Sequence, residues 1–90
     1  MIIEKKPKFV FTLAKILKYI KKDKINPARK FEKELNQKLN LLKQNPQMCR
    51  KSIYFEDESY RDLIYSGYTV VYKIETEKIL ILEIFKWQNR

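Results

Sequence analysis

The sequence contains no histidine, and it has only one cysteine and one glycine. Without histidine, neither an imidazole general base nor a His-ligated metal site can be built. Cys49 alone provides neither a zinc site nor an internal disulfide, which fits a reducing cytosol. One glycine excludes the phosphate-binding loops, because their motifs need more than one. We therefore expect no catalytic residue of the familiar kinds, no metal and no cofactor.

Long apolar runs are also missing. The longest are Phe9–Phe11 and Ile79–Leu82, far short of the ~20 residues of a membrane span. No secretory signal is visible at the N-terminus. The 90 residues are 44% hydrophobic and 13% aromatic, which is enough for one folded core and too apolar for a disordered tail. We expect a single cytoplasmic domain over residues 1–90, with no membrane partner.

The charge is basic and unevenly distributed. The chain has 20 Lys and Arg against 11 Asp and Glu, a net charge of +9. Residues 1–55 carry 15 basic and 4 acidic side chains, a net of +11, whereas residues 56–90 carry 5 and 7, a net of −2. A basic half favours an acidic partner such as nucleic acid, anionic lipid or an acidic protein segment. The same composition also arises from lysine-rich helices that are simply solvated.

Two amphipathic helices are predicted in the first half. Pro7–Lys22 has apolar residues at helical spacing and lysines outside that stripe. Asn26 and Pro27 predict the start of a second helix, as N-cap and first helical residue. Asn45-Pro46 predicts its end. The short break between the helices predicts an antiparallel hairpin. The apolar stripes are Phe9, Leu13, Ile16, Leu17 and Ile20 in the first helix, and Ala28, Phe31, Leu35, Leu39 and Leu42 in the second.

Strand patterns flank the two helices. The segments that can be extended are Met1–Glu4, Arg50–Phe55, Tyr60–Tyr65, Tyr68–Ile74 and Ile79–Trp87. Ser66-Gly67 predicts a tight turn, since glycine supplies the positive φ that such turns require. The order β-α-α-β-β-β predicts an α+β fold in which the helical hairpin packs on one face of an antiparallel sheet. On that face we expect Val70, Tyr72, Leu82 and Ile84.

The predicted sheet is apolar on its second face as well. A sheet with one face in water alternates cleanly between apolar and polar residues. The second face instead carries Val71, Ile79, Ile81, Phe85 and Trp87. Either the chain itself covers this strip or a partner does. Residues 1–6 are too few to cover much, so we favour burial by a partner.

Four segments follow one another at a distinctive spacing: Asn26-Pro27-Ala28, Asn45-Pro46, Tyr60–Ile74 and Ile79–Phe85. The third contains an arginine–x–leucine strand, a glycine turn and a tyrosine-ended strand. Together they resemble the RelE/ParE superfamily of toxins from bacterial type II toxin–antitoxin modules, more closely its ParE branch. Many members follow the last strand with a histidine and an arginine-rich tail, but this chain has Lys86–Arg90 there.

The resemblance implies a toxin that arrests growth and is neutralised by a cognate antitoxin, expected to be a short, acidic, partly disordered protein. The ParE branch is associated with inhibition of DNA gyrase, and the RelE branch cleaves mRNA on the ribosome. RNA cleavage requires groups that move protons and cations that stabilise the phosphorane charge. The cations available for it alternate with acidic residues along the sequence, so we favour gyrase inhibition. The alternatives are a RelE-like ribosome-dependent mRNA endoribonuclease and a small basic nucleic-acid-binding module whose sheet tyrosines stack bases.

Three sets of candidate residues follow from these readings. The predicted target-binding residues are Lys86, Trp87 and Arg90, since a solvent-facing Trp beside two cations suits an interface; Trp87 could equally cover the end of the core. The predicted antitoxin-binding residues are Val71, Ile79, Ile81 and Phe85, with Lys15 and Lys18 on the first helix. The alternative RNA-contacting residues are Arg50, Lys51, Arg61 and Lys73.

Overall fold

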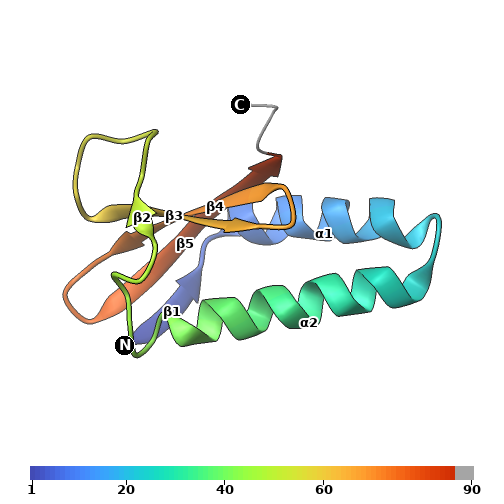
Figure 1. Cartoon of the computed structure of the whole chain (residues 1–90), viewed down its shortest axis with the longest axis horizontal. Coiled ribbons are helices and arrows are strands. Elements are labelled where there is room, and N and C mark those ends of the chain that lie inside the picture. Colours follow the sequence, from blue (N-terminus) through green and yellow to red (C-terminus); the bar gives the residue numbers. More distant parts are fainter. Residues whose placement is uncertain (87–90) are drawn as a thin grey trace.

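The computed structural model describes residues 1–86 and has two layers, a helical hairpin and a five-stranded sheet (Figure 1). The elements are β1 (Ile2–Lys5), α1 (Pro7–Lys21), α2 (Ile25–Leu41), β2 (Arg50–Lys51), β3 (Tyr60–Tyr65), β4 (Tyr68–Ile74) and β5 (Lys78–Lys86). The strand order in the sheet is β1-β5-β4-β3-β2. The predicted α+β class is confirmed, and the short strand β2 is one strand more than the predicted order β-α-α-β-β-β contains.

The sheet is mixed rather than antiparallel throughout. The strands β3 to β5 form the predicted antiparallel meander, and β2 extends it by pairing with β3. In contrast, β1 pairs in parallel with β5, from Ile2 opposite Lys78 to Lys5 opposite Ile81. A parallel pair requires a long crossover connection. Here the intervening helices and strands provide it, and the first strand therefore lies beside the last.

The helix boundaries differ from the prediction at both ends of α2. This helix begins at Ile25 after an extended Lys24, and no side chain caps it. Asn26 is therefore not the N-cap; it and Pro27 lie in the first turn, where a missing N–H costs no intrahelical bond. The α-helix ends at Leu41, earlier than predicted. From Leu42 to Gln44 each amide donates to the carbonyl three residues back, so the chain continues as tighter turns.

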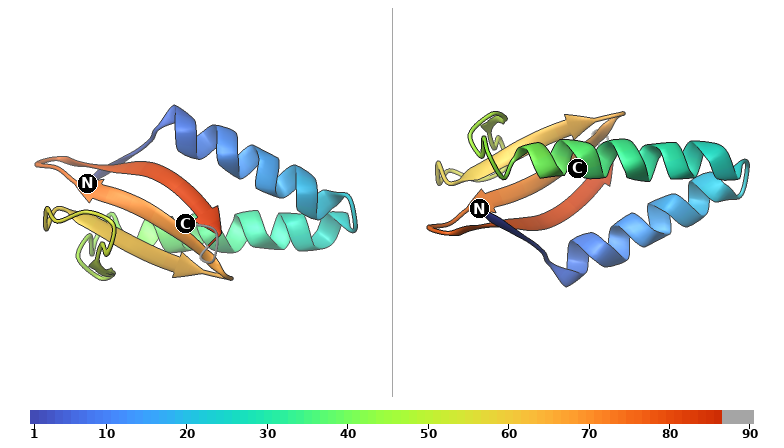
Figure 2. Two further views of the ribbon diagram at one scale, coloured as in Figure 1. Left: turned by 90° about the horizontal axis from the view of Figure 1, so that it is seen from above. Right: turned by 90° about the horizontal axis from the view of Figure 1, so that it is seen from below.

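The hairpin packs its apolar stripes against one face of the sheet, and its tip extends past the ends of the strands (Figure 2). Phe31 is central to this interface, with its ring centroid 5.1 Å from that of Tyr65 and 5.4 Å from that of Tyr68. The buried core comprises Phe9, Leu13, Phe31, Leu35, Leu39, Leu42, Leu63, Val70, Tyr72, Ile79, Ile81 and Ile84. It contains most of the predicted core. Leu17 and Ile20 pack against it but are only partly buried, and Leu82 is half-buried.

A β-bulge in β5 changes which residues face the helices. Val71 pairs with Glu83, but Tyr72 pairs with Ile81, so Leu82 is the extra residue. The bulge interrupts the two-residue alternation. As a result, Ile79 and Ile81 join Ile84 in the core beneath the helices. The prediction that Ile79 and Ile81 share the opposite face with Phe85 is wrong for this reason.

Part of the second face of the sheet is covered by the loop of residues 52–59. The amide of Ile53 donates to Asp62 Oδ2 at 3.0 Å, and the Tyr54 ring meets the Phe85 ring edge-on, with centroids 5.3 Å apart. Val71 lies on this face in register with Asp62 and Glu83, and it is 1% exposed. The chain therefore buries Val71 without a partner. Only Arg50–Lys51 of the predicted Arg50–Phe55 strand is extended, because the loop turns at Ser52, whose Oγ accepts from the Tyr54 amide.

Candidate functional site

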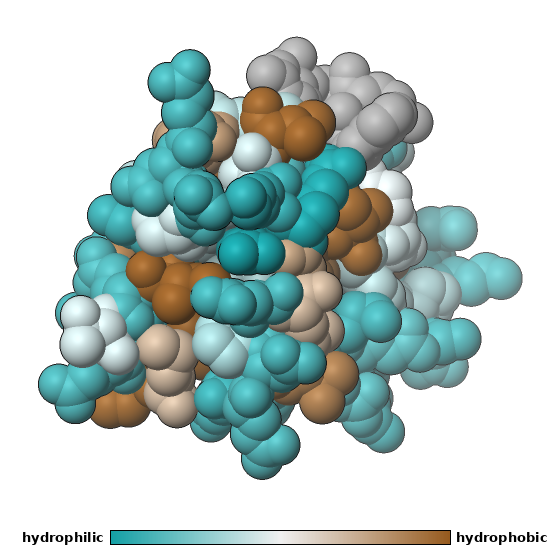
Figure 3. Space-filling model, turned by 60° about the vertical axis from the view of Figure 1, so that its left-hand side comes forward, coloured by the Kyte–Doolittle hydropathy of each residue, from teal (hydrophilic) through white to brown (hydrophobic). Residues whose placement is uncertain are grey.

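The apolar strip expected to bind the antitoxin is largely internal. Ile79 and Ile81 are 0% exposed and Val71 is 1% exposed. As buried core residues, these three cannot contact a partner unless the sheet opens. Phe85 is half-buried and stays at the surface. In Figure 3, apolar side chains on the face shown form separate patches among polar ones rather than a continuous strip.

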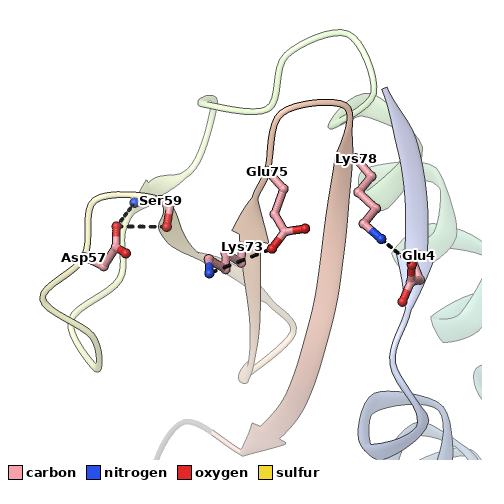
Figure 4. Close-up of polar contacts among 6 residues, drawn as sticks. All are labelled: Glu4, Asp57, Ser59, Lys73, Glu75 and Lys78. Atoms are coloured by element: carbon pink, nitrogen blue, oxygen red, sulfur yellow. Dashed lines mark hydrogen bonds and ion pairs between the residues drawn. The ribbon is translucent and has the colours of Figure 1, made fainter.

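The four candidate RNA-contacting cations all have partners within the chain. Arg50 Nη2 lies 3.4 Å from the buried carboxylate of Asp62, and Arg61 Nη1 donates to the Cys49 carbonyl at 3.0 Å. Lys51 Nζ lies 2.8 Å from Glu58 and lowers the pKa of that carboxyl, whereas Lys73 Nζ lies 3.8 Å from Glu75 (Figure 4). These contacts neutralise or engage each cation. The structure does not bring the four together as a free cationic patch.

No activated acid, base or nucleophile is evident among the groups whose pKa is displaced. Burial raises the pKa of the Cys49 thiol, which makes it a poorer nucleophile at neutral pH. Burial also raises the pKa of the Tyr72 phenol, which donates to the Pro46 carbonyl at 2.7 Å. Both groups therefore remain protonated near neutral pH.

Within residues 1–86, no three metal-ligating side chains gather in one place.

A groove lies between α1 and the end of the β4–β5 ladder, and we call it the α1 groove. Its volume is about 420 Å³, and it is lined by Thr12, Lys15, Ile16, Tyr19, Tyr68, Ile84, Phe85 and Lys86. The α1 residues recur every three or four positions, so they form one helix face. Tyr68 and Lys86 are register partners where β4 begins and β5 ends. Pairing of the two strands thus places the end of β5 beside the helix.

The α1 groove brings together residues that the sequence assigned to different partners. Lys15 and Phe85 are predicted antitoxin contacts, and Lys86 is a predicted target contact. Lys18 is exposed on α1 but does not line the groove. Trp87 and Arg90 lie outside the described residues. The prediction that these lysines and Phe85 bind partners remains a prediction.

The sequence analysis did not single out two exposed aromatic residues on α1. Phe11 is 64% exposed and Tyr19 is 68% exposed, although both are large and aromatic. A spacing of four residues separates Phe11 from Lys15 and Lys15 from Tyr19. The Nζ of Lys15 lies 4.6 Å from the Phe11 ring centroid. The signal was present in the sequence, because both aromatics fall outside the apolar stripe of the helix. Such off-stripe aromatics can mark a binding surface.

A second hollow lies at the tip of the hairpin, and we call it the tip hollow. It measures about 530 Å³ and is lined by Tyr19, Ile20, Lys22, Asp23, Lys24 and Pro27. Tyr19 lines both this hollow and the α1 groove. The two depressions therefore adjoin along one side of α1.

None of the helices within residues 1–86 is sufficiently long and apolar to traverse a bilayer.

Comparison with known proteins identifies the relatives of this chain. Residues 3–88 match the family model of the ParE toxin of the parDE type II toxin–antitoxin system. A solved structure of the chromosomal ParDE toxin–antitoxin system from P. aeruginosa is similar, with a TM-score of 0.78 and 21% sequence identity; the match covers 96% of this chain and 95% of that one. At this identity the likeness shows the fold alone. No curated protein sequence matches the chain.

Proposed function

Because the chain belongs to the ParE toxin family of type II toxin–antitoxin systems, we propose that it arrests growth by inhibiting DNA gyrase. One observation carries this proposal: the basic side chains at the sheet are already paired with acceptors of the same chain. Arg50 and Lys51 face carboxylates, and Arg61 donates to a backbone carbonyl. A site for phosphoryl transfer gathers cations that are free to meet the developing negative charge. Inhibition of another enzyme requires only a binding surface.

Carboxylates at the sheet strengthen the argument against RNA cleavage. Asp62 is 2% exposed and lies beside Arg50, the nearest cation to it on the neighbouring strand. A carboxylate close to a phosphate raises the energy of a phosphorane transition state. These features support a binding toxin over a ribonuclease.

The proposed gyrase-binding surface centres on the exposed end of β5. Lys86 is exposed there and is the last residue of the strand. It borders the α1 groove, whose aromatic residues provide the large apolar contacts that anchor interfaces. Trp87 and Arg90 follow it in the sequence, outside the described residues, and are proposed as further target-binding residues.

A supercoiling assay tests the proposal directly. Purified toxin should inhibit gyrase supercoiling of relaxed plasmid, and Lys86→Glu should need about tenfold more protein for half-inhibition, since it reverses a charge at the interface. Lys33→Glu is the matched control, because Lys33 is an exposed lysine on α2 outside the α1 groove. The same preparations should leave ribosome-bound mRNA intact. Codon-specific cuts at the ribosomal A site, lost on substitution of Lys73 or Arg61, would instead support the RelE-like activity.

A further inference from the structure

The tip of the helical hairpin carries cations that no carboxylate engages. We call this surface the basic tip; it comprises Lys18, Lys21, Lys22, Lys24, Arg29 and Lys30, all of which are exposed. Residues 18–30 contain one acidic side chain, Asp23, so six cations against one acid leave a net charge of +5. Among residues 1–86, none of the six lies within ion-pair distance of a carboxylate. The basic tip is therefore open to an anionic ligand.

The basic tip projects away from the sheet. The end of α1 and the start of α2 lie side by side there, and both extend past the ends of the strands (Figure 2). The four cations suggested for RNA lie on β2, β3 and β4, are engaged within the chain, and lie toward the other end of the molecule (Figure 1). A large, rigid ligand can thus reach the basic tip without meeting the sheet.

Helix stability accounts for only part of this charge. Lys18 and Lys21 lie in the last turn of α1, where the helix dipole favours cations. Lys24 takes the N-cap position of α2, where Asp, Asn, Ser and Thr are preferred, and the first turn of this helix has no acidic residue. The dipole disfavours cations at a helix N-terminus. Lys24 therefore opposes helix formation, and a bound polyanion would offset that repulsion.

The composition of the basic tip favours the backbone of double-helical DNA. A duplex carries one negative charge per about 1.7 Å of its axis, so it can meet several of these cations at once. Five of the six are lysines, which contact phosphates as point charges and read bases poorly. Proteins that bind single strands stack successive bases on aromatic side chains, whereas residues 18–30 contain only one aromatic residue, Tyr19.

A lipid surface fits the basic tip less well than a duplex does. Helices that lie on membranes turn a broad apolar face toward the lipid. Within residues 18–30, only Tyr19 and Ile25 are large, apolar and exposed. The apolar face of α1, with Phe9 and Leu13, is buried in the core beneath the helices. The exposed surface of the tip thus offers charge rather than apolar area.

We propose that the basic tip binds the phosphate backbone of duplex DNA, independently of base sequence, while the end of β5 binds gyrase. The inference rests on the proposed function and deepens it, because the duplex meant is the segment that gyrase holds during supercoiling. The tip hollow adjoins the α1 groove, which Lys86 borders. One toxin molecule can therefore contact the enzyme and its DNA along the same side of α1.

Fluorescence anisotropy with a short labelled duplex of mixed sequence tests the site without gyrase. For wild type, the logarithm of the binding constant should fall with that of the salt concentration, with a slope of about −4, as for four to five phosphate contacts. Lys22→Gln/Lys24→Gln/Arg29→Gln removes three cations of the basic tip. It should make the slope shallower by about 2–3 and weaken binding at low salt at least about tenfold.

The matched control removes the same charge elsewhere. Lys33→Gln/Lys38→Gln/Lys43→Gln changes three exposed lysines outside the basic tip, and it should keep the wild-type slope. Equal losses in the two triple variants would overturn the inference, because binding would then follow net charge rather than a site. A wild-type protein that does not bind the duplex at about 50 mM salt would overturn it as well.

A second variant keeps the inference testable if the triple variant folds poorly. Lys24→Asp places a preferred N-cap residue at the start of α2, so it should raise the Tm. The same change should weaken duplex binding several-fold, because it reverses one charge of the basic tip. A structural role alone would not weaken binding in a more stable protein. Duplex affinity equal to that of the wild type would contradict the proposal.

Competing ligands are tested with the same variants. Vesicles of phosphatidylcholine and phosphatidylglycerol, and single-stranded RNA, should bind more weakly than the duplex at the same salt concentration. If the triple variant of the basic tip lost binding to vesicles or to RNA but kept wild-type affinity for the duplex, the basic tip would belong to that ligand and the proposal would be wrong.

The contribution to gyrase inhibition is measured separately. The triple variant of the basic tip should capture DNA-free gyrase as well as wild type does, but it should need several-fold more protein for half-inhibition of supercoiling. Equal inhibition by the two proteins would refute the bridge between enzyme and DNA. If wild-type toxin does not inhibit gyrase at all, the proposed function fails, whereas the anisotropy still decides whether the basic tip binds DNA.

Discussion

Truncation of Ile81 tests whether this residue belongs to the core or to a surface. Ile81 is 0% exposed, and it lies in register between Lys5 of β1 and Tyr72 of β4. Removing a fully buried isoleucine side chain down to alanine costs about 2–5 kcal/mol, from lost transfer energy and the cavity that remains. The strands on both sides of β5 limit collapse of that cavity. We therefore expect Ile81→Ala to cost about 3 kcal/mol in the free energy of unfolding.

The matched control is the same substitution on the other face of the sheet. Ile64 in β3 is 46% exposed, and Ile64→Ala should change the free energy of unfolding by less than about 0.5 kcal/mol. Urea denaturation followed by far-UV circular dichroism measures both variants in the absence of any partner. In thermal melts, the Ile81 variant should lose about 12–24 °C in Tm, given the size of the domain.

The outcome separates two descriptions of β5. If Ile81 were instead a surface residue that contacts the antitoxin, Ile81→Ala would destabilise the free toxin as little as Ile64→Ala does. That result would refute the bulged register. Should Ile81→Ala prove too unstable to purify, Ile81→Val makes the same comparison with a smaller expected loss of about 0.5–1.5 kcal/mol.

Two further predictions concern polar contacts. Asp62→Ala removes the acceptor of the Ile53 amide and the partner of Arg50. It should lower the free energy of unfolding by about 2 kcal/mol and speed amide hydrogen exchange in residues 52–59. Unchanged exchange would mean that Asp62 does not hold this loop. Burial, and then the hydrogen bond to Glu34, raise the pKa of Tyr65 from 10.0 to about 12. The unfolded chain therefore loses this proton first, and stability should fall as pH rises from about 10 to 12. In spectrophotometric titration Tyr65 and Tyr72 should both ionise late, because burial raises both of their pKa values. Only the Tyr65 transition should shift downward in Glu34→Gln, and no such shift would contradict the assignment.

The features that the sequence predicted are those set by neighbouring residues. The apolar stripe from Phe9 to Ile20 specifies a helix because its spacing follows the helical period. Ser66 and Gly67 both adopt positive φ in the tight turn, at 51° and 83°, as the glycine indicated. The order of helices and strands and the α+β class followed from these local signals, and they were also sufficient for the resemblance to the toxin family.

The features that the sequence did not predict depend on contacts between distant segments. The parallel pairing of β1 with β5 joins opposite ends of the described chain. The bulge at Leu82 arises from the register between two strands, and it moved Ile79 and Ile81 from the expected partner surface into the core. The cover over Val71 comes from residues 52–59, a segment without periodicity.

The α1 groove is likewise a product of tertiary structure. Its walls come from residues 12–19 on a helix and from residues 68 and 84–86 on two paired strands. The sequence supplied the lysines and aromatics, but only packing of the helix beside the end of β5 decided which of them share one surface. Local sterics and periodicity act over a few residues, whereas a binding surface is decided by which faces the core buries and which it leaves in water.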